Sequence, residues 1–156
     1  LTDTADGLQI APHHERFGAA LQRLAERDGD RAHLNTAWHG DWTPWNTARS
    51  GHDTHVWDWE RFEEGVPPGL DRCHWAVNTM TRAHGLSEAR VAEGLTMAAA
   101  ARGSVAAQQG GDPAGAAYLA AITGRYLASV EEAGGELIQQ RALVMLASLE
   151  AHLTRS

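Results

Sequence analysis

The stretch from residue 38 to residue 46, Trp-His-Gly-Asp-Trp-Thr-Pro-Trp-Asn, decides the fold. It holds three of the six tryptophans of the chain, and the other three follow at positions 57, 59 and 75. Glycine and proline interrupt any regular element here, while the aromatic rings anchor the segment against other parts of the chain. We therefore predict an ordered loop, and we expect the function of the chain to lie in this window.

The residues around the loop have the pattern of a β-hairpin. Residues 31–60 are rich in glycine, threonine, asparagine and tryptophan, whereas alanine and glutamate dominate the flanking sequence. Two short runs with strand character meet at a turn around Ser50-Gly51. We expect Asn46 to lie on the first strand and Asp58 at the end of the second, so that the hairpin brings them together.

The remainder of the chain has the spacing of apolar residues that is typical of α-helices. Residues 12–27 form the first predicted helix, with Pro12 in its first turn. Residues 63–71 are predicted to be an irregular connector, because prolines and glycines continue neither regular structure. Ser87 and Asp112 are the predicted N-caps among the four helices that follow: residues 71–84, 87–109, 113–133 and 136–153.

These patterns together predict one domain of residues 1–156 that is mainly α with a small β-hairpin (α+β). Helix 12–27 comes first, the loop and hairpin occupy residues 31–60, and residues 71–154 form a helical subdomain. The last helix carries an apolar stripe from Leu137 to Leu153, which we expect to pack in the core.

Length and charge argue against several classes of protein. The 156 residues suffice for one ordinary domain, and a net charge of −7 argues against general binding of nucleic acid or of anionic membranes. No apolar run approaches the roughly 18 residues of a membrane span. The single Cys73 excludes an internal disulfide, and we expect a cytoplasmic protein with this cysteine buried on a helix.

The loop and hairpin carry four polar residues at a distinctive spacing. His39, Asp41 and Asn46 fit the pattern His-x-Asp-x-x-x-x-Asn, which arises by chance about once in a hundred such chains. Asp58 follows Asn46 on the far side of the predicted hairpin. Phosphoryl transfer needs a carboxylate that orients an attacking hydroxyl, together with magnesium held by hard oxygen ligands. Asp41 suits the first task, and the oxygens of Asn46 and Asp58 suit the second.

The stretch resembles the catalytic loop of the aminoglycoside phosphotransferase and choline kinase family, a branch of the protein-kinase-like superfamily. That branch has His-Gly-Asp where typical protein kinases have His-Arg-Asp, and Pro44 falls where the family usually has proline. Residues 56–60, Val-Trp-Asp-Trp-Glu, look like the family's metal-binding motif, the counterpart of Asp-Phe-Gly. Gly65, Pro67 and Asp71 are similar to a following Gly-x-Pro…Asp pattern, although one extra residue precedes the aspartate here.

The resemblance implies a role for each of these residues. Asp41 is implied to be the catalytic base, and Asn46 and Asp58 to be ligands of Mg²⁺ in its complex with ATP. His39 is implied to hold the loop, and Asp71 to be a scaffold carboxylate that bonds back to it. The implied substrate is a small molecule with a hydroxyl acceptor, such as an aminoglycoside, a choline-like amine or an amino sugar.

One part of the family's machinery is not expected in this chain. The family binds ATP between two lobes, and its N-terminal lobe supplies a phosphate-covering loop and a lysine. All 13 basic residues here are arginine, and only about 38 residues precede the loop. We therefore expect the C-terminal lobe alone, inactive by itself, with self-association through the uncovered lobe interface as one consequence.

Several side chains near the loop are candidates for substrate contacts, and each has a structural alternative. Trp42 and Trp45 suit stacking on a sugar or a cationic amine, but they also suit packing of the loop. Trp38, Trp57 and Trp59 are expected on strands, in the core or at the lobe interface. Three carboxylates suit a cationic acceptor but equally suit a solvated acidic surface: Glu60, Glu63 and Glu64.

Two other functions remain open from the sequence. A metal-dependent hydrolase with a zinc or manganese site would use four side chains: His39, Asp41, His55 and Asp58. A chain with only one lobe is also compatible with a non-catalytic interaction module or an inert fragment. Ligand preference distinguishes the three functions, since the kinase lobe takes magnesium with nucleotide, the hydrolase takes zinc without nucleotide, and the module takes neither.

Overall fold

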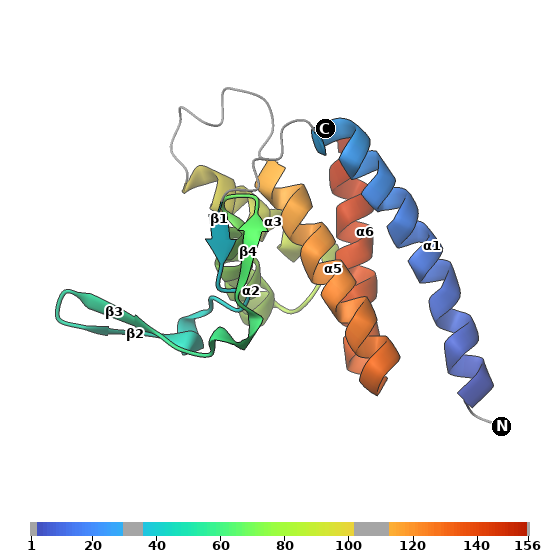
Figure 1. The fold of residues 1–156 in the computed structure, drawn as a ribbon, viewed down its shortest axis with the longest axis horizontal. Coiled ribbons are helices and arrows are strands. Elements are labelled where there is room, and N and C mark those ends of the chain that lie inside the picture. The colour runs from blue at the N-terminus through green and yellow to red at the C-terminus, as the bar shows by residue number, and fades with distance from the viewer. Residues whose placement is uncertain (1–2, 30–35, 102–112, 156) are drawn as a thin grey trace. The chain divides into compact units, whose positions relative to one another are not determined.

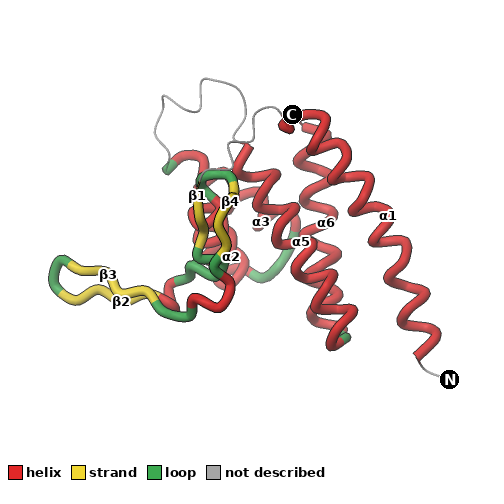
Figure 2. Tube along the Cα trace, in the orientation of Figure 1, coloured by secondary structure: helices red, strands yellow, loops and turns green. Residues whose placement is uncertain are grey.

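The computed structural model describes residues 3–29, 36–101 and 113–155, which are mainly helical with two small antiparallel sheets (Figures 1 and 2). The chain divides into two compact units, one of Arg31–Tyr118 and one that joins Leu1–Asp30 to Leu119–Ser156. None of the described helices is long and apolar enough to cross a membrane. The prediction of a mainly α chain with a small amount of β structure is confirmed.

The unit Arg31–Tyr118 contains both sheets and every predicted site residue. Its strands, helices and 3-10 helices follow one another along the chain: β1 (Thr36–Trp38), η2 (Pro44–Asn46), β2 (Thr47–Ser50), β3 (Asp53–Val56), η3 (Trp59–Arg61), β4 (Glu63–Val66), α2 (Leu70–His84) and α3 (Glu88–Ala100). The stretch that the sequence singles out, residues 38–46, begins with the last residue of β1 and ends with η2, directly before β2. It therefore connects a strand of one sheet to a strand of the other.

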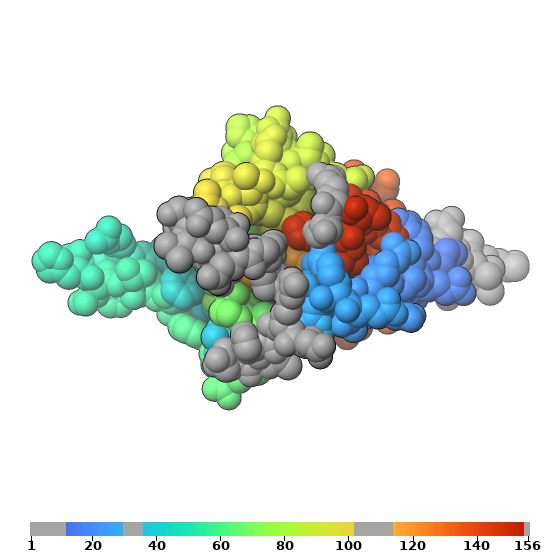
Figure 3. Space-filling model, turned by 90° about the horizontal axis from the view of Figure 1, so that it is seen from above, coloured from blue at the N-terminus to red at the C-terminus, as the bar shows by residue number. Residues whose placement is uncertain are grey.

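Strands β2 and β3 form the predicted hairpin. They pair antiparallel from Thr47 opposite Val56 to Ser50 opposite Asp53, with a tight turn at residues 51–52. The hairpin projects away from the helices of its own unit (Figures 1 and 3). Because most of its residues are exposed, only its base, next to the loop, contributes side chains to the site.

The predicted positions of the two candidate metal ligands relative to the strands are wrong. Asn46 ends the 3-10 helix η2 and does not lie on β2, because Pro44 fixes the backbone of the first helical position. Asp58 lies two residues beyond Val56, the last residue of β3, in a left-handed backbone conformation. The pairing nevertheless continues past the strands, so both residues lie at the base of the hairpin.

The sequence does not predict the second sheet, in which β1 pairs antiparallel with β4. Trp38 lies opposite Glu63 in this sheet and is 2% exposed. The prediction of an irregular connector over residues 63–71 is therefore wrong for its first four residues, which form β4. The two prolines follow the strand and do not interrupt it, so they remove no hydrogen bond from the pair.

Helices α2 and α3 pack against each other at very short range. A Cβ added to Gly94 of α3 would come within 2.6 Å of the Cα of Val77 on α2. Val77 and Val91 are essentially buried, as is Cys73, whose predicted place on a buried helix face is confirmed. The contact fixes α2, and α2 supplies two of the side chains that hold the loop.

The predicted start of the helix after residue 86 agrees with the structure, and its predicted end is wrong. Ser87 caps α3, since its Oγ accepts a hydrogen bond from the main-chain N–H of Arg90 at 3.4 Å. The prediction extends this helix over residues 87–109, whereas α3 ends at residue 100. Residues 102–112, including the predicted cap Asp112, lie outside the described residues.

The other unit contains α1 (Asp3–Asp28), most of α5 (Pro113–Ala133) and α6 (Glu136–Arg155). The guanidinium of Arg16 on α1 donates hydrogen bonds of 3.0 and 2.6 Å to the two carboxylate oxygens of Glu150 on α6. Buried and partly buried apolar side chains of all three helices form its core: Leu127, Val130, Ala142, Phe17, Tyr126 and Ile138. None of the predicted site residues belongs to this unit.

One prediction about this unit is wrong, and a second is wrong at one residue. Pro12 is predicted in a first turn, but α1 begins at Asp3 and Pro12 lies inside it. The φ angle of proline suits a helix, so the helix continues through it at the loss of one main-chain donor. The apolar stripe of the last helix packs in the core as predicted at Leu146 and Leu149, which are both 0% exposed. Leu137, however, is 63% exposed, because it lies in the first turn of α6, where the neighbouring Ile138 packs against the core instead.

Candidate functional site

The loop after β1 is held to helix α2 by the carboxylate of Asp71. Oδ2 of Asp71 accepts a hydrogen bond of 2.8 Å from the main-chain N–H of His39, and Oδ1 accepts one of 3.3 Å from that of Gly40. Asp71 lies in the first turn of α2, where the positive end of the helix dipole favours a carboxylate. The side chain therefore joins the loop to the helix in the manner of a scaffold residue.

His39 connects the loop to the chain that returns from the hairpin. Its Nδ1 accepts a hydrogen bond of 3.2 Å from the main-chain N–H of Asp41, so its proton is on Nε2. Nε2–H then donates to the main-chain oxygen of Trp57 at 2.9 Å. The ring is 1% exposed and lies 4.5 Å, centre to centre, from the ring of Trp59. Both ring nitrogens are occupied, which leaves His39 a supporting role.

Asn46 is tied to Asp41 by its side-chain amide. Nδ2 of Asn46 donates to the main-chain oxygen of Asp41 at 3.0 Å and to its Oδ2 at 2.9 Å. Both partners can only accept, so the orientation of the amide is fixed chemically. The nitrogen is thus committed to Asp41, and the oxygen Oδ1 is the atom of Asn46 that remains for a cation.

Asp58 lies at the base of the hairpin beside Asn46. The main-chain N–H of Trp57 donates to the main-chain oxygen of Asn46 at 3.2 Å, which brings the two chain segments together. Asp58 has φ 67° and ψ 56° and is the one non-glycine among the described residues with a positive φ. Its side chain is exposed and has no hydrogen-bond partner in the described part of the chain. An unpartnered carboxylate on a strained backbone is an arrangement that functional sites favour.

The candidate base Asp41 has a partner that the sequence does not predict, His74 of α2. Nε2 of His74 lies 3.0 Å from Oδ1 of Asp41. The pKa of the Asp41 carboxyl is lowered, first by this hydrogen bond, and further by Coulombic attraction to His74, the hydrogen bond from Asn46 and attraction to Arg61, although burial opposes the shift. The sequence indicates this partner only through its spacing from Asp71. His74 follows Asp71 by three residues, so both side chains lie on one face of α2.

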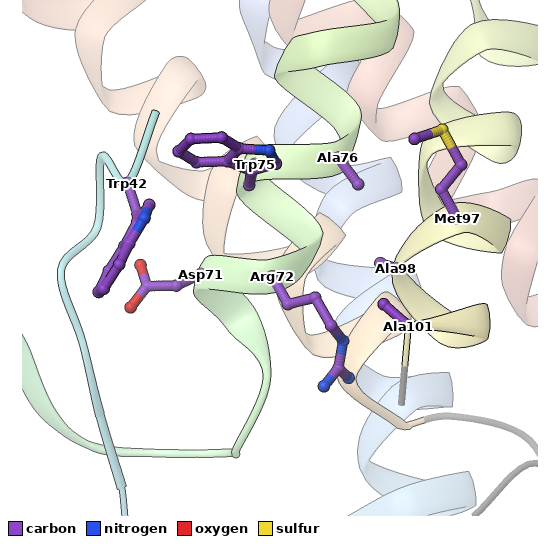
Figure 4. A pocket seen from close by; sticks show the side chains of 8 residues that line it. All are labelled: Trp42, Asp71, Arg72, Trp75, Ala76, Met97, Ala98 and Ala101. Atoms are coloured by element: carbon purple, nitrogen blue, oxygen red, sulfur yellow. The ribbon is translucent and has the colours of Figure 1, made fainter. Parts of the chain in front are cut away.

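A cavity of about 390 Å³ opens beside the loop, between it and helices α2 and α3 (Figure 4). The indoles of Trp42 and Trp75 lie at one end of it, and the carboxylate of Asp71 points toward Trp42 (Figure 4). The other lining residues come from the two helices and from the residue that follows α3: Arg72, Ala76, Met97, Ala98 and Ala101. Six of the eight lining residues are aromatic or aliphatic, and Asp71 and Arg72 add one charge of each sign. Walls that are mostly apolar suit a flat apolar group.

The other candidate substrate contacts do not line this cavity. The guanidinium carbon of Arg82 lies 4.7 Å from the centre of the Trp45 ring, so a protein cation already covers one face of that indole. The three glutamates are dispersed. Glu60 forms an exposed ion pair with Arg61 at 3.6 Å, Glu63 accepts a long 3.4 Å hydrogen bond from the Trp38 indole, and Glu64 is exposed on β4.

The tryptophans after the hairpin differ from their prediction. Trp57 and Trp59 are predicted on strands, but Trp57 follows β3 and Trp59 begins η3. They are 46% and 51% exposed, and Phe62 nearby is 47% exposed. Trp38, in contrast, lies on β1 and is buried, as predicted. The return from the hairpin therefore presents a group of exposed aromatic side chains next to the loop.

His39, one of the four candidate ligands of the alternative zinc or manganese site, is already engaged by hydrogen bonds within the protein. His39 uses one ring nitrogen as an acceptor for Asp41 and the other as a donor to Trp57, so neither can bind a metal. His55 is exposed on β3, opposite Ala48. Within the described residues, no group of three or more histidine, cysteine, aspartate or glutamate side chains could hold a metal ion. The geometry gives the hydrolase no support.

No protein-family model, curated protein or solved structure matches the chain.

Proposed function

We propose that the chain carries the catalytic loop and the metal-binding hairpin of a magnesium- and ATP-dependent phosphotransferase that acts on a hydroxyl of a small molecule. The observation that carries this proposal is the pair of hydrogen bonds from Asn46 to Asp41, which joins the candidate metal ligand to the candidate base. In this proposal the unit Arg31–Tyr118 belongs to the C-terminal lobe of a protein-kinase-like enzyme of the aminoglycoside phosphotransferase and choline kinase branch.

Asp41 is suited to orienting an acceptor hydroxyl. Its side chain is 30% exposed while that of His74 is 5% exposed, so an acceptor can approach the carboxylate from the solvent side. The lowered pKa keeps Asp41 ionised at neutral pH and makes it a weak proton acceptor. A weak base suffices for phosphoryl transfer through a loose transition state, in which orientation of the hydroxyl matters more than early removal of its proton.

Asn46 and Asp58 are the residues that would hold magnesium. The donor chemistry fits, because an amide oxygen and a carboxylate are hard ligands, and because Mg²⁺ keeps several waters and needs few protein ligands. The amide nitrogen of Asn46 is already used by Asp41, which leaves its oxygen for the ion. When bound, the ion supplies neutralisation of the charge on the nucleotide phosphates.

The cavity beside the loop is the proposed place for the non-reacting part of the acceptor. Trp42 follows Asp41 directly in the chain and lines the cavity together with Trp75. The carboxylates of Glu60, Glu63 and Glu64 lie elsewhere, so the cavity offers no cluster of negative charge for a polycation. We therefore propose an acceptor with one flat apolar face, such as an aromatic alcohol.

Titration of the ¹⁵N-labelled chain with Mg-ATP tests the proposal. We expect shifts of the main-chain amides in residues 40–43, 45–47 and 57–60, since these residues surround the proposed metal ligands. The dissociation constant should be in the hundreds of micromolar or weaker, about −5 kcal/mol or less favourable. The weakness follows from the absence of lysine in the chain, and the isolated chain should show no multiple turnover.

Asp58→Asn is the deciding variant, and Asp53→Asn is its matched control at the far end of the same hairpin. Asp58→Asn should weaken Mg-ATP binding by about tenfold or more, ~1.4 kcal/mol, whereas Asp53→Asn should leave it unchanged. Equal weakening by both variants would indicate only general attraction between the hairpin and the ion. Absence of any shift around the loop would refute the proposal.

One observation favours a second candidate, a non-catalytic interaction module. Trp57, Trp59 and Phe62 are each about half exposed, and exposed aromatic groups of this kind mark surfaces that contact other molecules. Sedimentation of the chain and of a Trp57→Ser/Trp59→Ser variant tests this candidate. A module that associates through this surface should lose its association in the variant without any dependence on Mg-ATP.

A further inference from the structure

His74 is a buried histidine whose ring makes one polar contact in the described part of the chain. Its side chain is 5% exposed, and its Nε2 lies 3.0 Å from Oδ1 of Asp41. Its Nδ1 is also buried and has no hydrogen-bond partner among the described residues. A buried polar atom without a partner is unfavourable. An apolar side chain at position 74 would avoid the free-energy cost of this buried nitrogen. The contact with Asp41 is therefore the feature that gives a histidine at this position a purpose.

The ring of His74 is held in one place by its aromatic neighbours. Trp38 meets it edge to face, with 6.4 Å between ring centres and 89° between planes. Tyr118 meets it in a similar way, at 5.8 Å and 70°. Both neighbours are essentially buried, so the imidazole has little freedom to rotate. The position of Nε2 is thereby fixed before it contacts Asp41.

The carboxylate of Asp41 is held from two sides. His74 of α2 contacts Oδ1, and the amide of Asn46 in η2 donates to Oδ2 at 2.9 Å. A carboxylate cannot donate when it is ionised, so the proton in the first contact belongs to Nε2 of His74. Two donors in different elements fix both the side-chain rotamer and the plane of the carboxylate. Each oxygen keeps a lone pair for an incoming hydroxyl.

Helix α2 thus holds the loop at two successive points. Asp71 binds the main chain of His39 and Gly40, and His74, three residues further along the helix, binds the side chain of Asp41. The three-residue spacing puts both on one face of α2. The helix therefore sets the position of the loop through Asp71 and the orientation of its carboxylate through His74.

We propose that His74 is a positioning residue for Asp41, whose Nε2–H holds Oδ1 so that the carboxylate presents one orientation to the acceptor hydroxyl. The inference rests on the proposed function, in which Asp41 orients that hydroxyl. The side chain of His74 is 5% exposed, so in this proposal it acts through Asp41 and does not touch the acceptor. Its effect is on the rotamer of Asp41, and the rotamer can be measured without any reaction.

Two variants separate the hydrogen bond from the packing. His74→Gln keeps an N–H donor at nearly the same reach, whereas His74→Met fills a similar volume without a donor. Three-bond couplings of the Asp41 side chain report its rotamer. We expect one rotamer at about nine tenths in the wild type, about a half in His74→Met, and recovery toward the wild-type value in His74→Gln. His84→Gln, at the exposed end of α2, is the matched control and should change nothing.

A spectroscopic measurement on the wild type keeps the proposal testable even where a variant fails to fold. Long-range ¹H–¹⁵N correlation of the His74 ring should show a proton on Nε2. A ring protonated only on Nδ1 would overturn the proposal, as would an Asp41 rotamer that stays fixed in His74→Met. Mg-ATP titration of the same samples tests the proposed function separately from the rotamer. An Asp41 rotamer that depends on His74, in a chain that binds no nucleotide, would support the positioning role of His74 and refute the phosphotransferase.

Discussion

The carboxylate of Asp71 accepts the main-chain N–H of His39 at 2.8 Å, and this bond fixes the loop on the first turn of α2. A second bond of 3.3 Å from the N–H of Gly40 uses the other oxygen. No other carboxylate in the described residues holds two main-chain donors of the loop. The hydrogen bonds of Asp71 therefore set the position of the loop that carries Asp41, and their effect on stability can be measured in the chain.

Asp71→Ala should destabilise the chain by about 2 kcal/mol, because two buried or partly buried donors lose a charged acceptor. Urea unfolding gives the stability, and hydrogen exchange at the amides of His39 and Gly40 gives the local effect. Asp53→Ala, an exposed aspartate on the hairpin, is the control and should change stability by less than about 0.5 kcal/mol. Unchanged exchange at the two amides in Asp71→Ala would contradict the hydrogen bonds.

Gly40 should be the least replaceable residue of the loop. It has φ +83°, and a Cβ there would overlap the main-chain oxygen of Arg61. Gly40→Ala should therefore cost more than the strain of a left-handed residue alone, about 2 kcal/mol or more. Gly51→Ala is the matched control, since Gly51 has φ +63° with open space around it and should cost about 1 kcal/mol. Equal costs in urea unfolding would mean that Arg61 moves away freely.

The helices could be predicted because their signals are local. Apolar periodicity gives α2, α5 and α6 within a few residues, and Ser87 marks the start of α3. Strand β4 could not be predicted from its own residues, Glu-Glu-Gly-Val, which have no strand pattern. It forms because Trp38 and its neighbours on β1 pair with it across a long sequence separation. Pairing between distant segments is information that a local pattern does not contain.

The candidate site also contains residues that the sequence reveals and one that it does not. Asp41, Asn46 and Asp58 could be selected from the sequence, because their spacing belongs to one loop and one hairpin. His74 could not be selected as a partner of Asp41, since it lies on a helix that must first fold against the loop. Its place three residues after Asp71 becomes informative only when Asp71 itself is known to face the loop.

The stability that Asp41 provides should depend on pH in a defined direction. Its pKa is lowered in the folded chain, mainly by the hydrogen bond from His74. The contribution is therefore complete above the unfolded pKa of about 3.9 and is lost as the pH falls through the lower folded value. The difference in unfolding free energy between wild type and Asp41→Asn should be constant from about pH 5 to 7 and shrink below about pH 4. A difference that grows in acid would contradict the lowered pKa.

The cavity should bind an uncharged aromatic alcohol better than a polycation. Trp42 and Trp75 line it, so their fluorescence should change when 2-phenylethanol is added, and Trp75→Ala should remove most of that change. Kanamycin, which carries several positive charges, should bind at least about tenfold more weakly in the same assay, because no acidic cluster lines the cavity. Trp45→Ala lies outside the cavity and is the control. Tighter binding of kanamycin would reverse the proposed substrate class.

Substitutions of Asp58 should affect the stability of the fold and the binding of Mg-ATP independently. Its backbone is left-handed, a conformation that asparagine tolerates about as well as aspartate and that alanine tolerates poorly. Asp58→Asn should therefore unfold within about 0.5 kcal/mol of the wild type, while Asp58→Ala should lose about 1 kcal/mol. Both variants lack the carboxylate, so both should lose Mg-ATP binding to a similar extent.

Urea unfolding and Mg-ATP titration of the two Asp58 variants, run side by side, check this separation. The carboxylate of Asp58 has no hydrogen-bond partner among the described residues, so its removal as Asp58→Asn breaks no described contact that stabilises the fold. Loss of binding without loss of stability would then assign the charge of Asp58 to a ligand. An Asp58→Asn variant that binds Mg-ATP as well as the wild type would remove Asp58 from the metal site and leave its left-handed backbone as a feature of the hairpin return alone.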